Sequence, residues 1–290
     1  MSDLLKSKKV IDTTWAMKKK SSGILRGRVN VQGFKQIDGQ HYIGTSISAP
    51  VTNTMTIKLT LTLMLMCSGI AHVVDIKGAF LYGEFEDGEK VYIKIPLGFE
   101  EFYDRNTVLL LKKTLYGLKQ AAMAFYRKLL AATANIGLKR STADPCLYYK
   151  WVEGRLVIMI SWINDNMILG PSNLVMQIKN DPMKQFECND CGHLEEYVGN
   201  KIDYIGKDAI QFTQNVLMQS YSDGFELPKR SYNMPAQPGT VLMKPVENGE
   251  VLSREAQSIL RSGIGKLMYH MQYSQPDIAQ AVRDLARHMT

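Results

Sequence analysis

The chain has 290 residues, 45% of them hydrophobic, so it can bury an ordinary core and form one large domain or two modest ones. Its 35 Lys and Arg against 28 Asp and Glu leave a formal net charge of +7, which favours a polyanionic partner such as nucleic acid, although many soluble proteins are equally basic. The start is polar and the longest uncharged run, residues 59–74, is too short to span a bilayer, so we expect an intracellular protein without a membrane partner.

The predicted elements mix helices and strands without regular alternation, which is typical of an α+β fold. The basic start, through Lys20, is expected to be loosely held, and residues 24–34 have the pattern of a hairpin of short strands. In chain order, the apolar pattern then predicts a helix at 56–66, strands at 72–76 and 91–95, a helix at 119–136, strands at 156–163 and 167–169, a helix at 175–186, strands at 197–204 and 209–212, and helices at 253–273 and 276–288.

A zinc site is one interpretation of the pair Cys188 and Cys191, which His193 follows closely. A structural zinc site takes four ligands, usually from two separated clusters, and the sequence has no second cluster. We therefore favour two free thiols.

Two acidic residues occupy unusual places. Asp75 ends the predicted strand 72–76, and Asp165 lies at the tip of the hairpin formed by residues 156–169. A carboxylate between apolar strands is costly unless it is paired or binds a metal. If these strands are neighbours in one sheet, both carboxylates converge, and a few carboxylates with two Mg²⁺ ions are suited to nucleotidyl transfer. The alternative is that each Asp is an ordinary cap or turn residue.

Several segments of the chain have the character of family motifs. The clearest are residues 75–81, DIKGAFL, residues 115–121, LYGLKQA, and residues 143–148, ADPCLY. In these segments, and in the same order, the chain resembles the copia-type retrotransposon reverse transcriptases, whose first motif reads D-V-K-T-A-F-L. Weaker matches extend the likeness over nearly the whole chain, at residues 26–36, 48–51, 91–99 and 267–278. The resemblance implies a right-hand polymerase fold of fingers, palm and thumb, in which helices back an antiparallel palm sheet.

The same resemblance implies a domain plan and partners. Residues 1–205 would form fingers and palm, with the palm at about 51–82 and 121–205, and residues 206–290 a thumb- or connection-like region without ribonuclease H. The implied partners are an RNA or DNA template with its primer and deoxynucleoside triphosphates, and the implied cofactor is Mg²⁺, two ions, with Mn²⁺ as a substitute. The implied location is a cytoplasmic particle, with the nucleus as the alternative, and oligomeric state is not indicated.

Roles transfer to individual residues where the motifs match. Asp75 falls at the first metal-binding Asp, and Phe80 at the steric gate that excludes a 2′-hydroxyl, unless it is simply a core residue. The remaining matches concern nucleotide and primer: Gly117 and Gln120 beside the nascent pair and incoming nucleotide, Arg26 and Arg28 near the triphosphate, and Tyr197, Val198 and Gly199 at the primer-positioning turn, whose alternative is an ordinary strand pair.

The hairpin departs from the family's Y-V-D-D. In one register Trp162 takes the aromatic place, Asn164 replaces the first Asp, and Asp165 is the second. In a register shifted by one, Asp165 is the first Asp and Asn166 replaces the second. We favour the first register because it keeps an aromatic residue in place and puts Gly170 at the usual distance from it.

Asn164 then stands where the family has a carboxylate that bridges both metal ions. The NH₂ group of Asn is a donor and cannot ligate Mg²⁺. We therefore predict an RNA-directed DNA polymerase module that is inactive or crippled, with metal ligands Asp75 and Asp165 only. A non-catalytic nucleic-acid-binding remnant and a pseudogene product are the alternatives.

Overall fold

The computed structural model describes residues 10–19, 23–44, 47–104, 107–180, 182–225, 232–237, 239, 242 and 252–289. The chain forms two compact units, Met1–His193 and Leu194–Thr290. The boundary predicted after residue 205 lies inside the second unit, between two strands of one hairpin. Among the described residues, no helix has both the length and the apolar character needed to cross a membrane.

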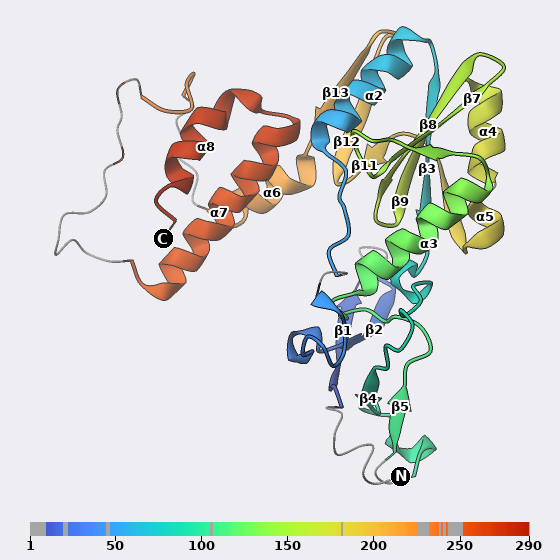
Figure 1. Cartoon of the computed structure of the whole chain (residues 1–290). Coiled ribbons are helices and arrows are strands. Elements are labelled where there is room, and N and C mark those ends of the chain that lie inside the picture. Colours follow the sequence, from blue (N-terminus) through green and yellow to red (C-terminus); the bar gives the residue numbers. More distant parts are fainter. Residues whose placement is uncertain are drawn as a thin grey trace. The chain divides into compact units, whose positions relative to one another are not determined.

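The first unit contains a six-stranded antiparallel sheet in the order β10-β3-β9-β8-β7-β6. Its strands β3, β7, β8 and β9 are labelled in Figure 1. Residues alternate between its two faces, and both faces of the central strands are apolar because helices cover both. The strands are β3 (Ile70–Ile76), β6 (Lys139–Arg140), β7 (Leu147–Val152), β8 (Arg155–Trp162), β9 (Asp165–Gly170) and β10 (Cys188–His193).

Helices α3 (Ala121–Asn135), α4 (Ser172–Asn180) and α5 (Pro182–Gln185) lie on one side of this sheet, and α2 (Thr54–Met66) lies on the other (Figure 1). The main core contains residues of α3 and α4 packed on one sheet face. The buried residues of this core include Val74, Ile76, Phe125, Leu129, Met159, Ile168, Val175 and Ile178. The α+β prediction is confirmed, and the helix predicted at 175–186 is two helices, the second beginning at Pro182.

Asp144, in the ADPCLY segment, ties the start of α2 to the loop before β7. One carboxylate oxygen accepts from Thr52 Oγ1 at 3.0 Å and from the backbone N–H of Asn53 at 2.9 Å, and the other accepts from the N–H of Cys146 at 2.9 Å. Burial by itself raises the pKa of Asp144, but the hydrogen bonds, first from Asn53, outweigh burial and hold this pKa below its ordinary value. The ionised carboxylate is therefore part of the fold.

A second core lies under the N-terminal hairpin of this unit. Strand β1 (Thr13–Lys19) pairs antiparallel with β2 (Leu25–Val31), and β4 (Tyr92–Lys94) pairs with β5 (Val108–Leu110). The expectation of a loosely held start is wrong for residues 13–19, and it lies outside the described residues for 1–9. The hairpin predicted within 24–34 is instead one strand of a hairpin whose other strand lies upstream.

The described residues of the second unit form a three-stranded antiparallel sheet and three α-helices. The sheet has the order β11-β12-β13, formed by β11 (Glu196–Tyr197), β12 (Asn200–Ile205) and β13 (Ala209–Thr213). The helices are α6 (Asn215–Ser222), α7 (Arg254–Tyr273) and α8 (Ala279–Ala286), and α8 follows a short 3-10 helix at Pro276–Ile278. The strand predicted at 209–212 and the helix predicted at 253–273 are confirmed within a few residues. The strand predicted at 197–204 is two strands joined by a turn, and the helix predicted at 276–288 begins as a 3-10 helix and ends earlier than expected. Helix α6 was not predicted.

Candidate functional site

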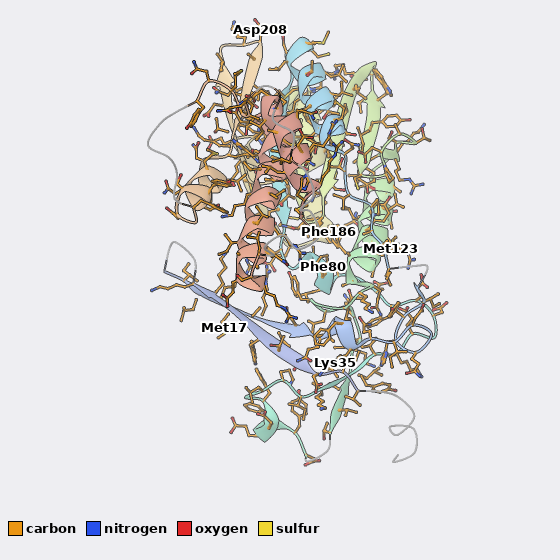
Figure 2. All side chains as sticks on the ribbon, turned by 90° about the vertical axis from the view of Figure 1, so that its left-hand side faces the viewer. Met17, Lys35, Phe80, Met123, Phe186 and Asp208 are labelled. Carbon is orange, nitrogen blue, oxygen red and sulfur yellow. The ribbon has the colours of Figure 1, made fainter. Side chains whose placement is uncertain are left out.

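A cleft of about 540 Å³ opens in the first unit beside the end of β3. Figure 2 shows Phe80 between the large sheet and the β1–β2 hairpin, whose first strand carries Met17. The lining of the cleft combines cationic, anionic, amide and aromatic side chains, a mixture suited to a charged and partly flat ligand. The polar and aromatic members are Arg26, Arg28, Asp75, Lys77, Phe80, Tyr116, Asn164 and Asn189.

The two predicted carboxylates lie opposite each other on adjacent strands. Asp75 of β3 pairs directly with Asp165 of β9, and on its other side Asp75 pairs with Asn189 of β10. Directly opposed residues have Cβ atoms about 4.5–5.5 Å apart, and like charges in this relation destabilise a sheet. The sheet therefore brings both carboxylates together, as the sequence predicted for neighbouring strands.

The β8–β9 turn holds Asn164 over this pair. Trp162 pairs with Asp165, which leaves Ile163 and Asn164 as a two-residue turn. Ile163 has φ +56°, a conformation that a β-branched residue adopts only under strain. The backbone N–H of Ile76 donates to the carbonyl of Asn164 at 2.9 Å, and this bond fastens the turn to β3.

The Asn164 amide makes contact with both carboxylates. Its Nδ2 donates to Asp75 Oδ1 at 2.5 Å and to Asp165 Oδ1 at 3.3 Å. Asn189 Nδ2 donates to the second carboxylate oxygen of Asp75 at 3.4 Å. Amide donors thus lie beside both of the opposed carboxylates.

This donor set does not fit the two-ion centre that the resemblance implies. Two carboxylates remain as oxygen ligands for a hard cation, but the third position directs an NH₂ group at both of them. Within the part of the chain that the structure describes, no three His, Cys, Asp or Glu side chains are grouped to hold a metal ion. The four cysteines, Cys188 and Cys191 among them, are free thiols.

Asn166 bears on the choice of register. Its side chain is buried, and its Nδ2 donates to the backbone carbonyl of Asn164 at 2.9 Å. Because strand residues alternate, Asn166 and Asp165 belong to opposite sheet faces. The shifted register would therefore put its second acidic position on the face away from Asp75. The geometry favours the register in which Asn164 and Asp165 are the two motif positions.

The cationic and aromatic side of the cleft is built around Tyr116. The Arg28 guanidinium lies 4.6 Å from the Tyr116 ring centroid, and the Phe80 ring meets the same ring edge to face at 5.4 Å. Phe80 also packs against both cores of the unit, so it lines the cleft and supports the core at once. Arg26 lies two residues from Arg28 on β2, on the same face of the hairpin.

Lys77 adds a further positive charge. Its Nζ is 2.8 Å from a carboxylate oxygen of Glu187, and this hydrogen bond, with the charge of Glu187, raises the pKa of Lys77. The ammonium group therefore stays charged at neutral pH.

Gly117 and Gln120 are not among the residues that line the cleft. Gly117 has φ +88°, and a Cβ there would lie 2.1 Å from the carbonyl oxygen of Val31. Gln120 is buried, accepts from Gln36 Nε2 at 2.9 Å and donates to the carbonyl of His41 at 2.9 Å. Both residues hold the segment after β2 against the LYGLKQA segment, and direct contact with a nucleotide stays a prediction.

The predicted primer-positioning turn lies in the second unit. Tyr197 pairs with Asn200, and the two residues between them, Val198 and Gly199, have φ +49° and +69°. Positive φ at both central positions defines a type I′ hairpin turn. The Tyr197 side chain is buried in the unit and Val198 is half-buried, whereas Gly199 is exposed. A role of this turn in primer binding stays a prediction.

Sequence reasoning missed three side chains of the cleft, Lys77, Tyr116 and Asn189. Lys77 and Tyr116 stand inside recognised motifs, next to residues that were chosen, so their position was a usable signal. Asn189 stands in a segment not predicted to be a strand, and only its pairing with β3 brings it beside Asp75.

Residues 1–234 match the family model described as reverse transcriptase (RNA-dependent DNA polymerase). The chain is similar to the Retrovirus-related Pol polyprotein from transposon TNT 1-94 of Nicotiana tabacum, with 29% identity over 98% of the chain and 22% of that protein. It is similar to the Pol polyprotein from transposon RE1 of Arabidopsis thaliana, with 28% identity over 97% of the chain and 19% of that protein.

Among solved structures, a foamy viral protease-reverse transcriptase in complex with double-stranded DNA aligns with a TM-score of 0.46 and 10% identity. The alignment covers 92% of this chain and 38% of that one. The chain spans about a fifth of the length of the curated relatives it matches, 22% of one and 19% of another.

Proposed function

This chain belongs to the reverse transcriptase (RNA-dependent DNA polymerase) family, and on that premise we propose that it is a polymerase module of a copia-type retrotransposon that binds template, primer and nucleotide but is severely impaired in nucleotidyl transfer. The contacts of Asn164 carry the second half of this proposal. Its amide donates to the carboxylates that would hold the catalytic ions.

The family uses divalent metal ions, and the chain keeps only part of the means to bind them. Asp75 and Asp165 would hold a hard cation such as Mg²⁺, or Mn²⁺ in its place. A second ion needs a carboxylate that bridges both, and Asn164 offers one carbonyl oxygen and no charge. Removing one carboxylate from a two-metal centre costs several kcal/mol of transition-state stabilisation, so the expected loss of turnover is about a thousandfold or more.

The remaining cleft supports nucleotide binding. We assign Arg26 and Arg28 to the triphosphate, because guanidinium groups bind phosphate oxygens in pairs. We assign Phe80 as the steric gate, since its ring lines the cleft and is held in place by Tyr116 and two cores. In this proposal Gly117 and Gln120 hold the LYGLKQA segment against the segment after β2, and so keep Tyr116 in the lining of the nucleotide-binding cleft.

The proposed partners are an RNA or DNA template with its primer, and deoxynucleoside triphosphates. The Val198–Gly199 turn is assigned to the primer, because an exposed hairpin turn can place backbone groups against a sugar-phosphate strand. Location in a cytoplasmic particle, or in the nucleus, is part of the proposal that rests on the family resemblance alone.

A non-catalytic nucleic-acid-binding role is the second candidate. One observation favours it: the cationic residues of the cleft are present although the metal site is altered. In that case binding itself is the function, and the lost chemistry has no consequence for it.

Binding and chemistry can be measured in one sample. The chain as written is titrated with a labelled primer on an RNA template at 50 and 200 mM salt, and single-nucleotide incorporation is then followed with Mg²⁺. We expect binding that weakens steeply with salt, and incorporation at least about a thousandfold slower than a typical enzyme turnover of about 1–1000 per second. Arg28→Gln should weaken binding of the next nucleotide, whereas Lys139→Gln, an exposed substitution on β6, should not. Rapid incorporation by the unaltered chain would contradict the proposed impairment, and no binding at 50 mM salt would contradict the proposed module.

A further inference from the structure

The Val198–Gly199 turn is strained and needs support. A type I′ turn favours Asn-Gly or Asp-Gly, and its first central position here carries the β-branched Val198 at φ +49°. Such a conformation persists only where surrounding contacts hold it in place.

Two side chains converge on the Val198 carbonyl. Asn200 Nδ2 donates to it at 2.9 Å and also to the carbonyl of Tyr197 at 3.2 Å, and Asn200 is completely buried. The hydroxyl of Tyr269, from helix α7, donates to the same Val198 oxygen. A Cβ at Gly199 would lie 3.7 Å from this hydroxyl oxygen, so the Tyr269 hydroxyl lies directly against the turn.

Tyr269 is itself fixed by an aromatic row that runs from the helix to the sheet. Its ring lies 5.1 Å from that of Tyr273, one helical turn later, and the Tyr273 ring lies 6.4 Å from that of Phe212 on β13. Burial, and then the neighbouring Tyr273, raise the pKa of Tyr269, so its hydroxyl keeps its proton and remains a donor at neutral pH. The donor is thus held on a helix, on one side of a sheet.

We propose that Tyr269 is a positioning residue for the primer-binding turn: its hydroxyl fixes the Val198 carbonyl and so sets the conformation in which the turn meets the primer terminus. This inference rests on the proposed function. It assigns a role to one residue of the matched segment 267–278, because Tyr269 couples the orientation of α7 to a turn 71 residues earlier in the chain. A displacement of the helix by the length of one hydrogen bond would break this contact and leave the Val198 carbonyl to the hydrogen bond from Asn200.

The test uses Tyr269→Phe in the full chain, which removes the hydroxyl and keeps the ring. The control is Ser274→Ala, which removes a hydroxyl that bonds Gln214 at the end of the same helix and does not touch the turn. Hydrogen–deuterium exchange of the peptide spanning residues 195–203 is compared in the three proteins. We expect about threefold to tenfold faster exchange in Tyr269→Phe, the factor that follows from losing one hydrogen bond, and no change in Ser274→Ala.

A second readout concerns the primer. A primer with 2-aminopurine at its 3′ end is bound to the same proteins on an RNA template, and the fluorescence of the terminal base is recorded at saturation. We expect Tyr269→Phe to change this signal while overall affinity stays within about twofold, since most affinity comes from phosphate contacts elsewhere. Unchanged exchange in Tyr269→Phe, or equal changes in both variants, would overturn the positioning role. Failure of the unaltered chain to bind the primer at all would contradict the proposed function and the primer role with it, whereas the exchange result would still report on the turn.

Discussion

Asn164 donates a hydrogen bond to the carboxylate of Asp75 at 2.5 Å, across the boundary between the β8–β9 turn and strand β3. The same amide reaches Asp165 at 3.3 Å. An uncharged donor between two opposed carboxylates offsets their repulsion without a metal ion. Asn164 in place of an aspartate therefore removes a metal ligand, and it also reduces the electrostatic repulsion between carboxylates in the metal-free protein.

Restoring a carboxylate at this position should make stability depend on metal. We expect Asn164→Asp to lower the free energy of unfolding by about 1–3 kcal/mol without divalent ions, because a charge-assisted hydrogen bond is replaced by repulsion. Added Mg²⁺ should restore much of this loss, since it binds the folded state only. Thermal unfolding at increasing Mg²⁺ concentration measures both effects, and Asn180→Asp, which adds the same charge at an exposed position of α4, serves as the control. If the melting temperature of Asn164→Asp does not change with Mg²⁺ concentration, the side chains at positions 75, 164 and 165 do not bind an ion together.

Substitution of Gly117 by alanine should lower the free energy of unfolding far more than the same substitution at Gly98, a glycine with nearly the same backbone conformation. Gly117 and Gly98 have φ of +88° and +90°, but a Cβ at Gly117 would meet the Val31 carbonyl at 2.1 Å, whereas a Cβ at Gly98 would meet no atom within 4 Å. We expect Gly98→Ala to cost about 1–2 kcal/mol, the penalty of the left-handed conformation alone. Gly117→Ala should cost more than about 4 kcal/mol, because backbone must move. Urea unfolding of both variants gives the comparison, and equal costs would mean that the two segments are not closely packed.

The contrast between elements that were predicted and those that were not has a physical cause. Helix α2 and strands β3 and β9 were predicted because their apolar residues are dense enough to indicate burial whatever surrounds them. Strand β10, with the sequence CNDCGH, has little intrinsic strand preference and contains a bulge between Asp190 and Gly192. Its conformation comes from pairing with β3, which no local pattern reports.

The candidate site shows the same division. The sequence predicted that Asp75 and Asp165 lie close together, because each ends or begins a predicted strand and the two strands were assumed to be neighbours. The structure confirms that β3 and β9 are neighbours. The Asn164 amide points at Asp75 because of the geometry of the β8–β9 turn. Asn189 lies beside Asp75 because the edge strand β10 pairs with β3. Such contacts are set by tertiary pairing and therefore needed the structure.

Asp144 should make stability depend on pH in the acid range. Its pKa in the folded protein lies below the ordinary value of 3.8, so ionisation stabilises the fold above that value, and the contribution is lost as pH falls through the lowered pKa. Asp144→Asn should cost about 1–3 kcal/mol at pH 7, because it removes charge-assisted acceptors of the Thr52 and Asn53 donors. Denaturant unfolding from pH 7 to pH 3 should show the two proteins converging as pH falls. A constant difference across this range would show that the charge of Asp144 is not what stabilises the start of α2.

Phe80 should discriminate against ribonucleotides once chemistry is restored. In the Asn164→Asp background, Phe80→Val keeps apolar contact with the two cores but shortens the side chain that lines the cleft. We expect the preference for a deoxynucleotide over the matching ribonucleotide to fall by about tenfold or more, measured as a ratio of kcat/KM values. Phe102→Ala, a truncation of a ring that is 67% exposed and outside the cleft lining, should leave this ratio unchanged. An unaltered ratio in Phe80→Val would leave Phe80 as a core residue only.

The most direct test of the central claim is the rate of single-nucleotide extension of a primer on an RNA template with Mg²⁺, for the chain as written and for Asn164→Asp. We predict that Asn164→Asp is faster by about a thousandfold or more, because a bridging carboxylate is restored, and that adding Asp75→Ala removes the gain. The substitution adds one negative charge within the lining of the cleft, so the Asn180→Asp variant again controls for charge alone. If the chain as written extends primers as fast as Asn164→Asp does, then Asn164 is not a lost metal ligand and the assignment of the hairpin is contradicted.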